Sequence, residues 1–263
     1  MGSATREALA AARRALASVS SEDGLATATQ LFEAGRVIGH SAQLRAALAD
    51  PSAAAADKKA VIGSIFSSLG ASAKSLLSEI ASTRWSTQDD LLAGIEEIGI
   101  RAAAASAPGA PIEAELFTFG AAVSSDAELE LAVGSKLGTP AAKSALVSAL
   151  LSGKATPQTV AIVDHLVQQP RGRRLGELIR TAAAIVADEA NLSVATVVSA
   201  TPLDDKQLER LRVGLSKQHG RDLRINQVID PTIIGGLRVQ IGDDVIDGSV
   251  STRLTDLRLR LAS

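Results

Sequence analysis

Three aspartates near the C-terminal end, Asp243, Asp244 and Asp247, form the arrangement in this sequence that most resembles a cation site. Carboxylate oxygens suit hard divalent cations, but the other oxygen ligands of a calcium-binding loop are missing at the required spacing. Residues 242–244 instead predict the turn of a hairpin, and residues 247–249 predict a turn that leads into a helix N-cap. We therefore predict no metal site.

Catalysis finds no support in the histidines or in the familiar nucleotide and hydrolase motifs. His40, His165 and His219 lie far apart in the sequence without an obvious nucleophile nearby, so we expect them at the surface or at helix ends. Residues 153–156, Gly-Lys-Ala-Thr, lack the first glycine and the Lys-Ser/Thr pair of a phosphate loop. Cysteine is absent, which excludes disulfides and thiolate metal sites. We predict no catalytic residue and no cofactor.

A short basic run over residues 170–174, Pro-Arg-Gly-Arg-Arg, has the charge to contact phosphate. The chain has a formal net charge of −2, only 2% aromatic residues and no wider basic stripe. A solvated loop is therefore favoured over a nucleic-acid contact, and no nucleic-acid partner is predicted.

Arg84 and Trp85 stand just before a predicted helix start and form a candidate interface. Tryptophan and arginine are favoured at the energetic centres of protein interfaces. Burial of Trp85, the only tryptophan of the chain, in its own helical bundle explains it equally well. Both interpretations stand at this point.

The elements that must position these residues are, over 3–190, consecutive helices with apolar residues at a period of 3.6. Prolines fall between the periodic runs, as their missing N–H and ring clash require. Short side-chain oxygens that can accept an otherwise orphaned N–H mark the helix starts. The predicted N-caps are Ser3, Ser21, Ser41, Ser52, Ser72 and Thr87.

An internal repeat is visible when the helical region is shifted by 85 residues against itself. The shift places Leu31-Phe32-x-x-Gly35 on Leu116-Phe117-x-x-Gly120, and one residue of slippage then aligns Leu76 with Val160 and Leu91 with Leu175. Chance similarity between alanine- and leucine-rich helices is the alternative. The matched Phe and Gly spacing favours a duplicated helical bundle, with copies over 1–107 and 108–190 joined by the long helix around 87–107.

Residues 191–263 predict a small α/β domain, so the fold class is mainly α with a C-terminal mixed-sheet module. Alternating, β-branched runs predict strands over 193–200, 223–229, 233–241 and 244–246, and a charged amphipathic run predicts a helix over 203–219. A terminal helix is expected over 249–262, with Leu254, Leu257 and Leu261 on one face. Gly235 and Gly236 are expected to serve the backbone, through positive φ or a bulge, and not to bind a ligand.

This tail carries a resemblance. The run Ile234-Gly235-Gly236-Leu237-x-Val239-x-Ile241-Gly242-Asp243-x-Val245-Ile246-Asp247-Gly248-Ser249-Val250-x-x-Arg253-Leu254 resembles the C-terminal signature of F-type ATP synthase delta subunits, called OSCP in mitochondria. The segment Arg84-Trp85-Ser86-x-x-Asp89-Asp90-Leu91 looks like actinobacterial members. Within the signature, Arg253 could pair with Asp247, a surface contact worth only about 0–1 kcal/mol.

The resemblance implies a non-catalytic stator subunit that links the catalytic head to the peripheral stalk. It implies that the helical region binds the N-terminal helices of alpha subunits and that the C-terminal domain binds the b-type stalk subunit. Family members usually have one helical bundle, and the proposed duplication would account for the longer chain. No apolar run approaches the ~20 residues that span a bilayer, so we expect any membrane association to be through a partner. The resemblance implies a peripheral location at the cytoplasmic face of the membrane. The alternatives are a general helical-repeat adaptor and an enzyme of unknown type.

Overall fold

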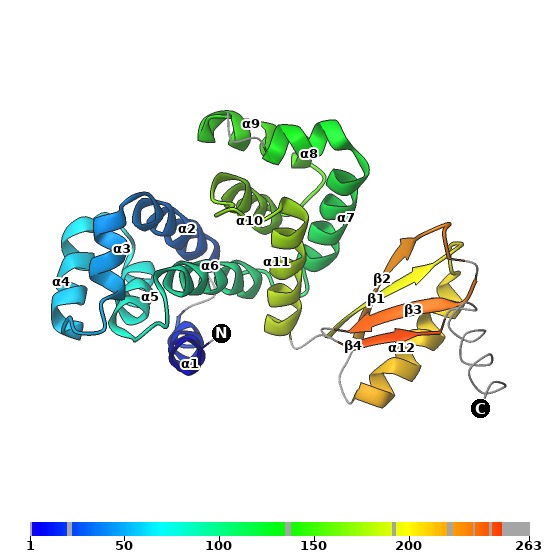
Figure 1. The fold of residues 1–263 in the computed structure, drawn as a ribbon, viewed down its shortest axis with the longest axis horizontal. Helices are drawn as coiled ribbons and strands as arrows, with labels where there is room; N and C mark the ends of the chain where they lie inside the picture. Colours follow the sequence, from blue (N-terminus) through cyan, green and yellow to red (C-terminus); the bar gives the residue numbers. More distant parts are fainter. Residues whose placement is uncertain are drawn as a thin grey trace, which may run out of the picture. The chain divides into compact units, whose positions relative to one another are not determined.

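The computed structural model describes residues 2–19, 23–134, 138–190, 193–219, 223–233, 235–241 and 244–248. The chain forms two compact units, Met1–Val186 and Ala187–Ser263 (Figure 1). The first is helical and the second combines a helix with a four-stranded sheet. The predicted fold class, mainly α with a C-terminal α/β module, is confirmed.

The helical unit is a succession of antiparallel and crossing helices around one continuous hydrophobic core. In Figure 1 the long helix α6 runs between α1–α5, coloured blue to cyan, and α7–α11, coloured green. The helices are α1 (Ser3–Leu16), α2 (Gly24–His40), α3 (Ala42–Ala49), α4 (Ala55–Ile65), α5 (Ala71–Ser82), α6 (Gln88–Ala105), α7 (Ile112–Ser125), α8 (Ala127–Gly134), α9 (Pro140–Leu151), α10 (Pro157–Gln168) and α11 (Leu175–Glu189).

Side-chain caps fix several helix starts. Thr87 accepts the backbone N–H of Asp90 at 3.0 Å, and Ser41 accepts that of Leu44 at 3.2 Å, so these two predicted N-caps are confirmed. Thr139 and Thr156 cap α9 and α10, each with proline as the first helical residue.

Three other predicted caps are wrong. Ser3 and Ser72 lie inside their helices, which are preceded by Gly2 and Gly70, and Ser52 lies ahead of the residue that precedes α4. Glycine and alanine at those starts leave the first N–H groups without a side-chain acceptor, so the rule that favours serine misplaces the boundaries by one or two positions. Ser21 lies outside the described residues.

Helix α6 is buried on almost every side. It contacts α1, α2, α5 and α10, and its buried positions run nearly without a break from Leu91 to Ala103. Two of its glycines make room for aromatic rings, because a Cβ on Gly94 would meet the Trp85 ring and one on Gly99 would meet the Phe32 ring at 2.5 Å. Helix α6 is therefore the central buried helix of the unit, against which several other helices pack.

The C-terminal unit is built from a βαβ crossover followed by a hairpin. Strands β1 (Ser193–Ser199) and β2 (Leu223–Ile229) pair in parallel and are connected by α12 (Asp205–His219). Strands β3 (Leu237–Ile241) and β4 (Asp244–Asp247) pair antiparallel, and the sheet order is β2-β1-β3-β4. Leu215 of α12 joins a small core with residues that alternate along the strands, Ala195, Val197, Leu223 and Val239.

The strand around the paired glycines is shorter than predicted. β3 begins at Leu237 and not at residue 233, because Gly235 and Gly236 have φ values of +133° and +86°, which an extended strand does not allow. The pair therefore forms the bend that leads into β3. The expected helix over 249–262 lies outside the described residues.

Candidate functional site

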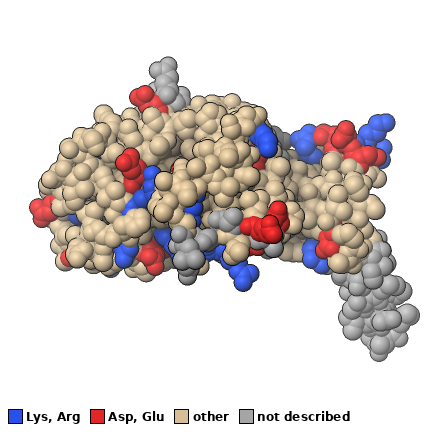
Figure 2. Space-filling view, turned by 90° about the horizontal axis from the view of Figure 1, so that it is seen from above, with Lys and Arg blue, Asp and Glu red and all other residues tan. Residues whose placement is uncertain are grey.

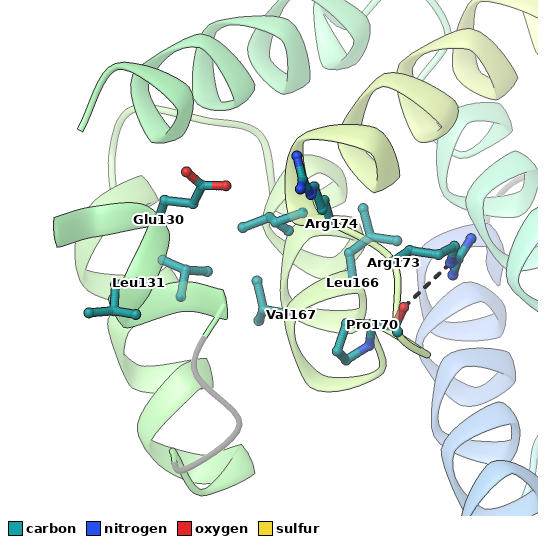
Figure 3. Close-up of a pocket in the computed structure, with 10 residues that line it drawn as sticks. Glu130, Leu131, Leu166, Val167, Pro170, Arg173 and Arg174 are labelled. Carbon is teal, nitrogen blue, oxygen red and sulfur yellow. Dashed lines mark hydrogen bonds between the residues drawn. The ribbon is translucent and has the colours of Figure 1, made fainter. Parts of the chain in front are cut away.

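A groove of about 420 Å³ opens between α8, the end of α10 and the loop before α11 (Figure 3). Its walls are largely aliphatic, with charged groups at the edges. The lining residues are Glu130, Leu131, Val133, Leu166, Val167, Pro170, Gly172, Arg173, Arg174 and Leu175.

The side chains at the rim give the groove an apolar and a charged side. Leu131 on α8 is 74% exposed, the most exposed large apolar side chain in the described part of the chain. In Figure 3 it lies across from Val167 of α10, whereas Arg173 turns away from the groove. An exposed aliphatic residue beside an apolar hollow has the chemistry of a protein-binding surface and no group for catalysis.

A second hollow, of about 690 Å³, involves the predicted interface residues Arg84 and Trp85. Arg84 is exposed, but Trp85 is only 4% exposed, and its indole N–H donates to the Ile80 carbonyl at 2.8 Å. The structure thus shows the second of the two interpretations of Trp85, burial in its own bundle. Arg84 remains available at the rim of this hollow.

A buried ion cluster surrounds Glu96 of α6, whose side chain is 7% exposed. One guanidinium nitrogen of Arg173 donates to both Glu96 carboxylate oxygens at 2.9 Å. Arg171 Nη2 lies 2.9 Å from Glu96 Oε1, and His165 Nε2 lies 3.4 Å from Oε2, which is long for a hydrogen bond. Glu96 is thus met by three cationic or polar partners from α10 and the following loop.

The ionisation of the cluster follows from its charges. Burial would raise the pKa of Glu96, but the contact with His165 and the charges of Arg171 and Arg173 outweigh burial and hold the pKa at about 2. Burial lowers the pKa of His165, Glu96 opposes that shift, and Arg36 and Arg171 add to it. At neutral pH the carboxylate is therefore ionised, the imidazole is neutral, and the two arginines already exceed the one negative charge.

The expectations for the basic run and for His165 are corrected here. His165 lies in the last turn of α10, as a helix-end residue should, but it is 1% exposed and stacks on Phe32 of α2. Arg171 and Arg173 do not belong to a solvated loop, because both pair with Glu96. The signal in the sequence is the run of apolar residues on both sides of Glu96 in α6, because a carboxylate within a buried helix must have partners.

A neighbouring buried glutamate faces another direction. Glu97 accepts from Arg13 of α1 at 2.6 Å and from Arg101, one turn further along α6, at 2.9 Å. Consecutive residues on a helix point about 100° apart, so Glu96 and Glu97 hold different neighbours of the same helix. Glu97 fastens α1, whereas Glu96 fastens α10 and its following loop.

Only part of the predicted tail signature can be placed. Gly235 and Gly236 form the bend before β3, and the Gly248 N–H donates to the Leu237 carbonyl at 2.9 Å, at the end of the hairpin. Asp247 is the last residue of β4. The remaining predicted positions, Gly242, Asp243, Ser249, Arg253, Leu254 and Leu257, lie outside the described residues.

On the face drawn in Figure 2 the helical unit is mostly uncharged, with acidic and basic side chains interspersed. Within the described ranges, no helix is long and apolar enough to cross a membrane. Those same ranges contain no group of three or more His, Cys, Asp or Glu residues arranged to hold a metal ion.

Comparisons with known proteins agree with one another. A family model described as ATP synthase delta (OSCP) subunit matches residues 100–261. The ATP synthase subunit delta of Leifsonia xyli is 58% identical over 263 residues, with all of both chains covered. That of Streptomyces avermitilis is 38% identical over 268 residues, covering 99% of this chain and 98% of the relative.

A solved structure also resembles this chain. A chain of the cryo-EM structure of the Toxoplasma gondii mitochondrial ATP synthase hexamer gives a TM-score of 0.38 at 21% identity. The similarity covers 57% of this chain and 85% of that one.

Proposed function

The chain belongs to the ATP synthase delta (OSCP) subunit family, and from this premise we propose that its two compact units make two different attachments within the ATP synthase. It is a non-catalytic peripheral-stalk subunit of an F-type ATP synthase. Such a subunit transmits torque, so it needs rigid packing and separate binding surfaces. The single continuous core of the helical unit and the distinct α/β unit supply both.

The helical unit is proposed to be two copies of one bundle, residues 1–107 and 108–190, with α6 shared between them. The family model matches residues 100–261, so of the two proposed copies it includes the second and only the end of the first. Helices α3 and α8 start 85 residues apart, as do α4 and α9. Their lengths are also alike, 8 and 8 residues for the first pair and 11 and 12 for the second.

Burial recurs with the same period, give or take one residue. Each buried residue of α5 that is apolar has a buried counterpart 86 positions later in α10, and buried residues of α6 recur 84 positions later in α11. The first set pairs Ala73, Leu76, Leu77, Ile80 and Ala81 with Thr159, Ile162, Val163, Leu166 and Val167, and the second pairs Leu91, Ile95 and Ile98 with Leu175, Ile179 and Ala182. Leu76 therefore matches Ile162, and not Val160 as the sequence shift predicted.

Two specific contacts are also repeated. Gln30 of α2 accepts the N–H of Gly70, which precedes α5, at 2.8 Å, and Glu115 of α7 accepts the N–H of Thr156, which precedes α10, at 2.9 Å. A Cβ on Gly35 would meet Ile95 at 3.3 Å, and one on Gly120 would meet Ile179 at 3.1 Å. Side chains at matching positions thus make similar contacts in both halves, which supports a duplication over chance similarity of helices.

For the attachment to the head, we propose that the groove beside Leu131 receives an amphipathic N-terminal helix of an alpha subunit. A helix in a groove inserts aliphatic side chains at one face, and the groove offers Leu131, Val167 and Leu175 to such a face. Arg174, exposed at the edge, would meet an acidic group on the partner. The observation that supports this choice is the exposed Leu131 beside an otherwise unfilled apolar hollow.

The test replaces Leu131 with aspartate and measures binding to the purified head and to a synthetic alpha N-terminal peptide. Because Leu131 is 74% exposed, the variant should keep its melting temperature, while affinity should fall at least about tenfold. Ile65→Asp is the matched control, since Ile65 is exposed on α4, away from the groove. Unchanged peptide binding by Leu131→Asp would reject the groove but leave the family assignment intact.

The C-terminal unit is proposed to hold the b-type stalk subunit, at the cytoplasmic face of the membrane. It has its own small core, so removal after residue 190 leaves the helical unit whole. In reconstituted vesicles, the truncated chain should stay on the head and leave ATP hydrolysis intact, but proton flow should no longer drive synthesis. Normal coupling by the truncated complex would show that the stalk is held elsewhere.

A further inference from the structure

The two proposed helical copies are connected along the chain by the short segment between α6 and α7. After α6, residues 106–111 lead into α7, and Gly109 in this stretch has a φ of +81°. A Cβ on Gly109 would meet nothing within 4 Å, so the segment lies open. Helices α7–α11 could swing about this point if α6 were their only link to α1–α5.

Non-covalent contacts that oppose such a swing lie where the end of α10 and its following loop meet α2 and α6. The Phe32 and His165 rings stack with centroids 4.3 Å apart and planes 13° apart. Next to them, the Gln169 amide nitrogen donates to the Gly35 carbonyl at 3.0 Å. These contacts join α2 of the first copy directly to the end of α10 in the second.

The ion cluster around Glu96 adds to the same contact by joining α6 to α10 and its following loop. Its acid comes from α6 and its three partners come from α10 and the loop 169–174. Arg171 Nη1 also donates to the Asp89 carbonyl in the first turn of α6, at 3.4 Å. The loop is thus fastened to α6 at two levels about two turns apart.

We propose that Glu96, with Arg171, Arg173 and the Phe32–His165 stack, is an electrostatic lock that fixes the second helical copy against the first and makes the doubled region one rigid arm. A buried carboxylate with two arginines fits one geometry only, since any displacement leaves buried charge without a partner. Apolar surfaces alone tolerate sliding. The lock therefore fixes the orientation of the second copy relative to the first more than it strengthens their association.

The first test measures the distance between the copies in the full-length chain. Because the chain has no cysteine, Lys59→Cys on α4 and Lys154→Cys after α9 give two exposed labelling sites for spin-label distance measurements. The parent should give one narrow distance distribution. Glu96→Gln should broaden it, whereas Glu97→Gln should leave it narrow, because Glu97 faces α1 and not α10.

Hydrogen exchange gives the second measurement on the same variants. Amides of residues 165–174 should exchange about a hundredfold faster in Glu96→Gln, the fold-change that matches about 3 kcal/mol for a broken buried ion set. Arg173→Gln, a milder change at a side chain that is 28% exposed, should accelerate the same amides by less. Arg174→Gln is its control, since Arg174 is exposed and adjacent.

A narrow, unshifted distribution in both Glu96→Gln and Arg173→Gln would overturn the lock. If Glu96→Gln lost helical structure, Arg173→Gln and its control would still decide the question. The biological meaning of a rigid arm rests on the proposed head-binding role. The distance measurement reads the joint alone, so a failure of the lock and a failure of head binding remain distinguishable.

Discussion

Phe32 and His165 lie 133 positions apart in the chain and stack almost parallel, with ring centroids 4.3 Å apart. The imidazole is enclosed between this phenyl ring and the Glu96 carboxylate, and it is 1% exposed. Burial in that position lowers the pKa of His165 below its ordinary value, which gives the helical unit a pH dependence.

Stability should fall as the pH is lowered below 6.5. Burial lowers the pKa of His165, so below pH 6.5 the unfolded chain binds a proton that the folded chain does not bind. The free energy of unfolding therefore decreases by up to ~1.4 kcal/mol per pH unit. Glu96, with a pKa of about 2, contributes its own loss only when the pH falls from about 4.5 toward 2. Urea unfolding followed by Trp85 fluorescence checks this.

The control for the pH dependence is His165→Phe, which keeps a ring against Phe32 but cannot be protonated. Its slope between pH 6.5 and 5 should be shallower than that of the parent. Equal slopes would show that other groups carry the acid sensitivity.

Glu115→Ala should destabilise the helical unit by about 2 kcal/mol. One carboxylate oxygen of Glu115 accepts from the backbone N–H and hydroxyl of Thr156 and from the Thr159 hydroxyl, so truncation leaves buried donors without an acceptor. Glu115→Gln should cost much less, because a glutamine side chain, Gln30, accepts the N–H that precedes α5 in the same way. Chemical denaturation compares the two, and equal losses would mean that the charge, and not the acceptor, matters.

Gly94→Ala should destabilise by about 1–3 kcal/mol, because the added methyl group would overlap the buried Trp85 ring. Gly63→Ala on α4 is the matched control: nothing lies within 4 Å of its Cβ, and alanine gains up to about 1 kcal/mol of helix propensity. The melting temperature should therefore fall in Gly94→Ala and rise in Gly63→Ala. A neutral Gly94→Ala would indicate that Trp85 has room to shift.

Gly236→Ala should weaken the C-terminal sheet by about 1–3 kcal/mol, because a φ of +86° strains any residue with a Cβ. Gly214→Ala, at an open position on α12, should leave it unchanged or slightly firmer. The only tryptophan lies in the other unit, so hydrogen exchange of the β1 amides is the suitable measurement. Unaltered exchange in Gly236→Ala would show that the bend accepts another conformation.

The sequence allowed prediction of what depends on nearby residues. The caps at Ser41 and Thr87 are predictable because the acceptor and its donor are three residues apart, and the alternation of residues 223–229 predicts the bounds of β2 correctly. The predicted strand 233–241 is too long because the apolar pattern continues past the glycines, and only their positive φ values show that β3 begins at Leu237.

The ion cluster escaped prediction because its members come from separate helices. Arg171 and Arg173 follow Glu96 by some 75 residues, and nothing local marks them as partners. Their neighbours in the sequence, Pro170 and Gly172, suggest an exposed loop. Only the packing of α10 against α6 turns that loop inward, and the position of α10 is a property of the whole bundle.

The proposed sharing of α6 has a consequence for the history of the gene. A deletion of α1–α5 that kept α6 would remove α2 from α6 and expose Leu92, Ile95 and Gly99, which pack against α2. The shortened chain would therefore expose an apolar surface and tend to aggregate, and it would not restore a short ancestral protein. Several substitutions along α6 would have to precede the deletion. A longer helical region is therefore easier to gain than to lose.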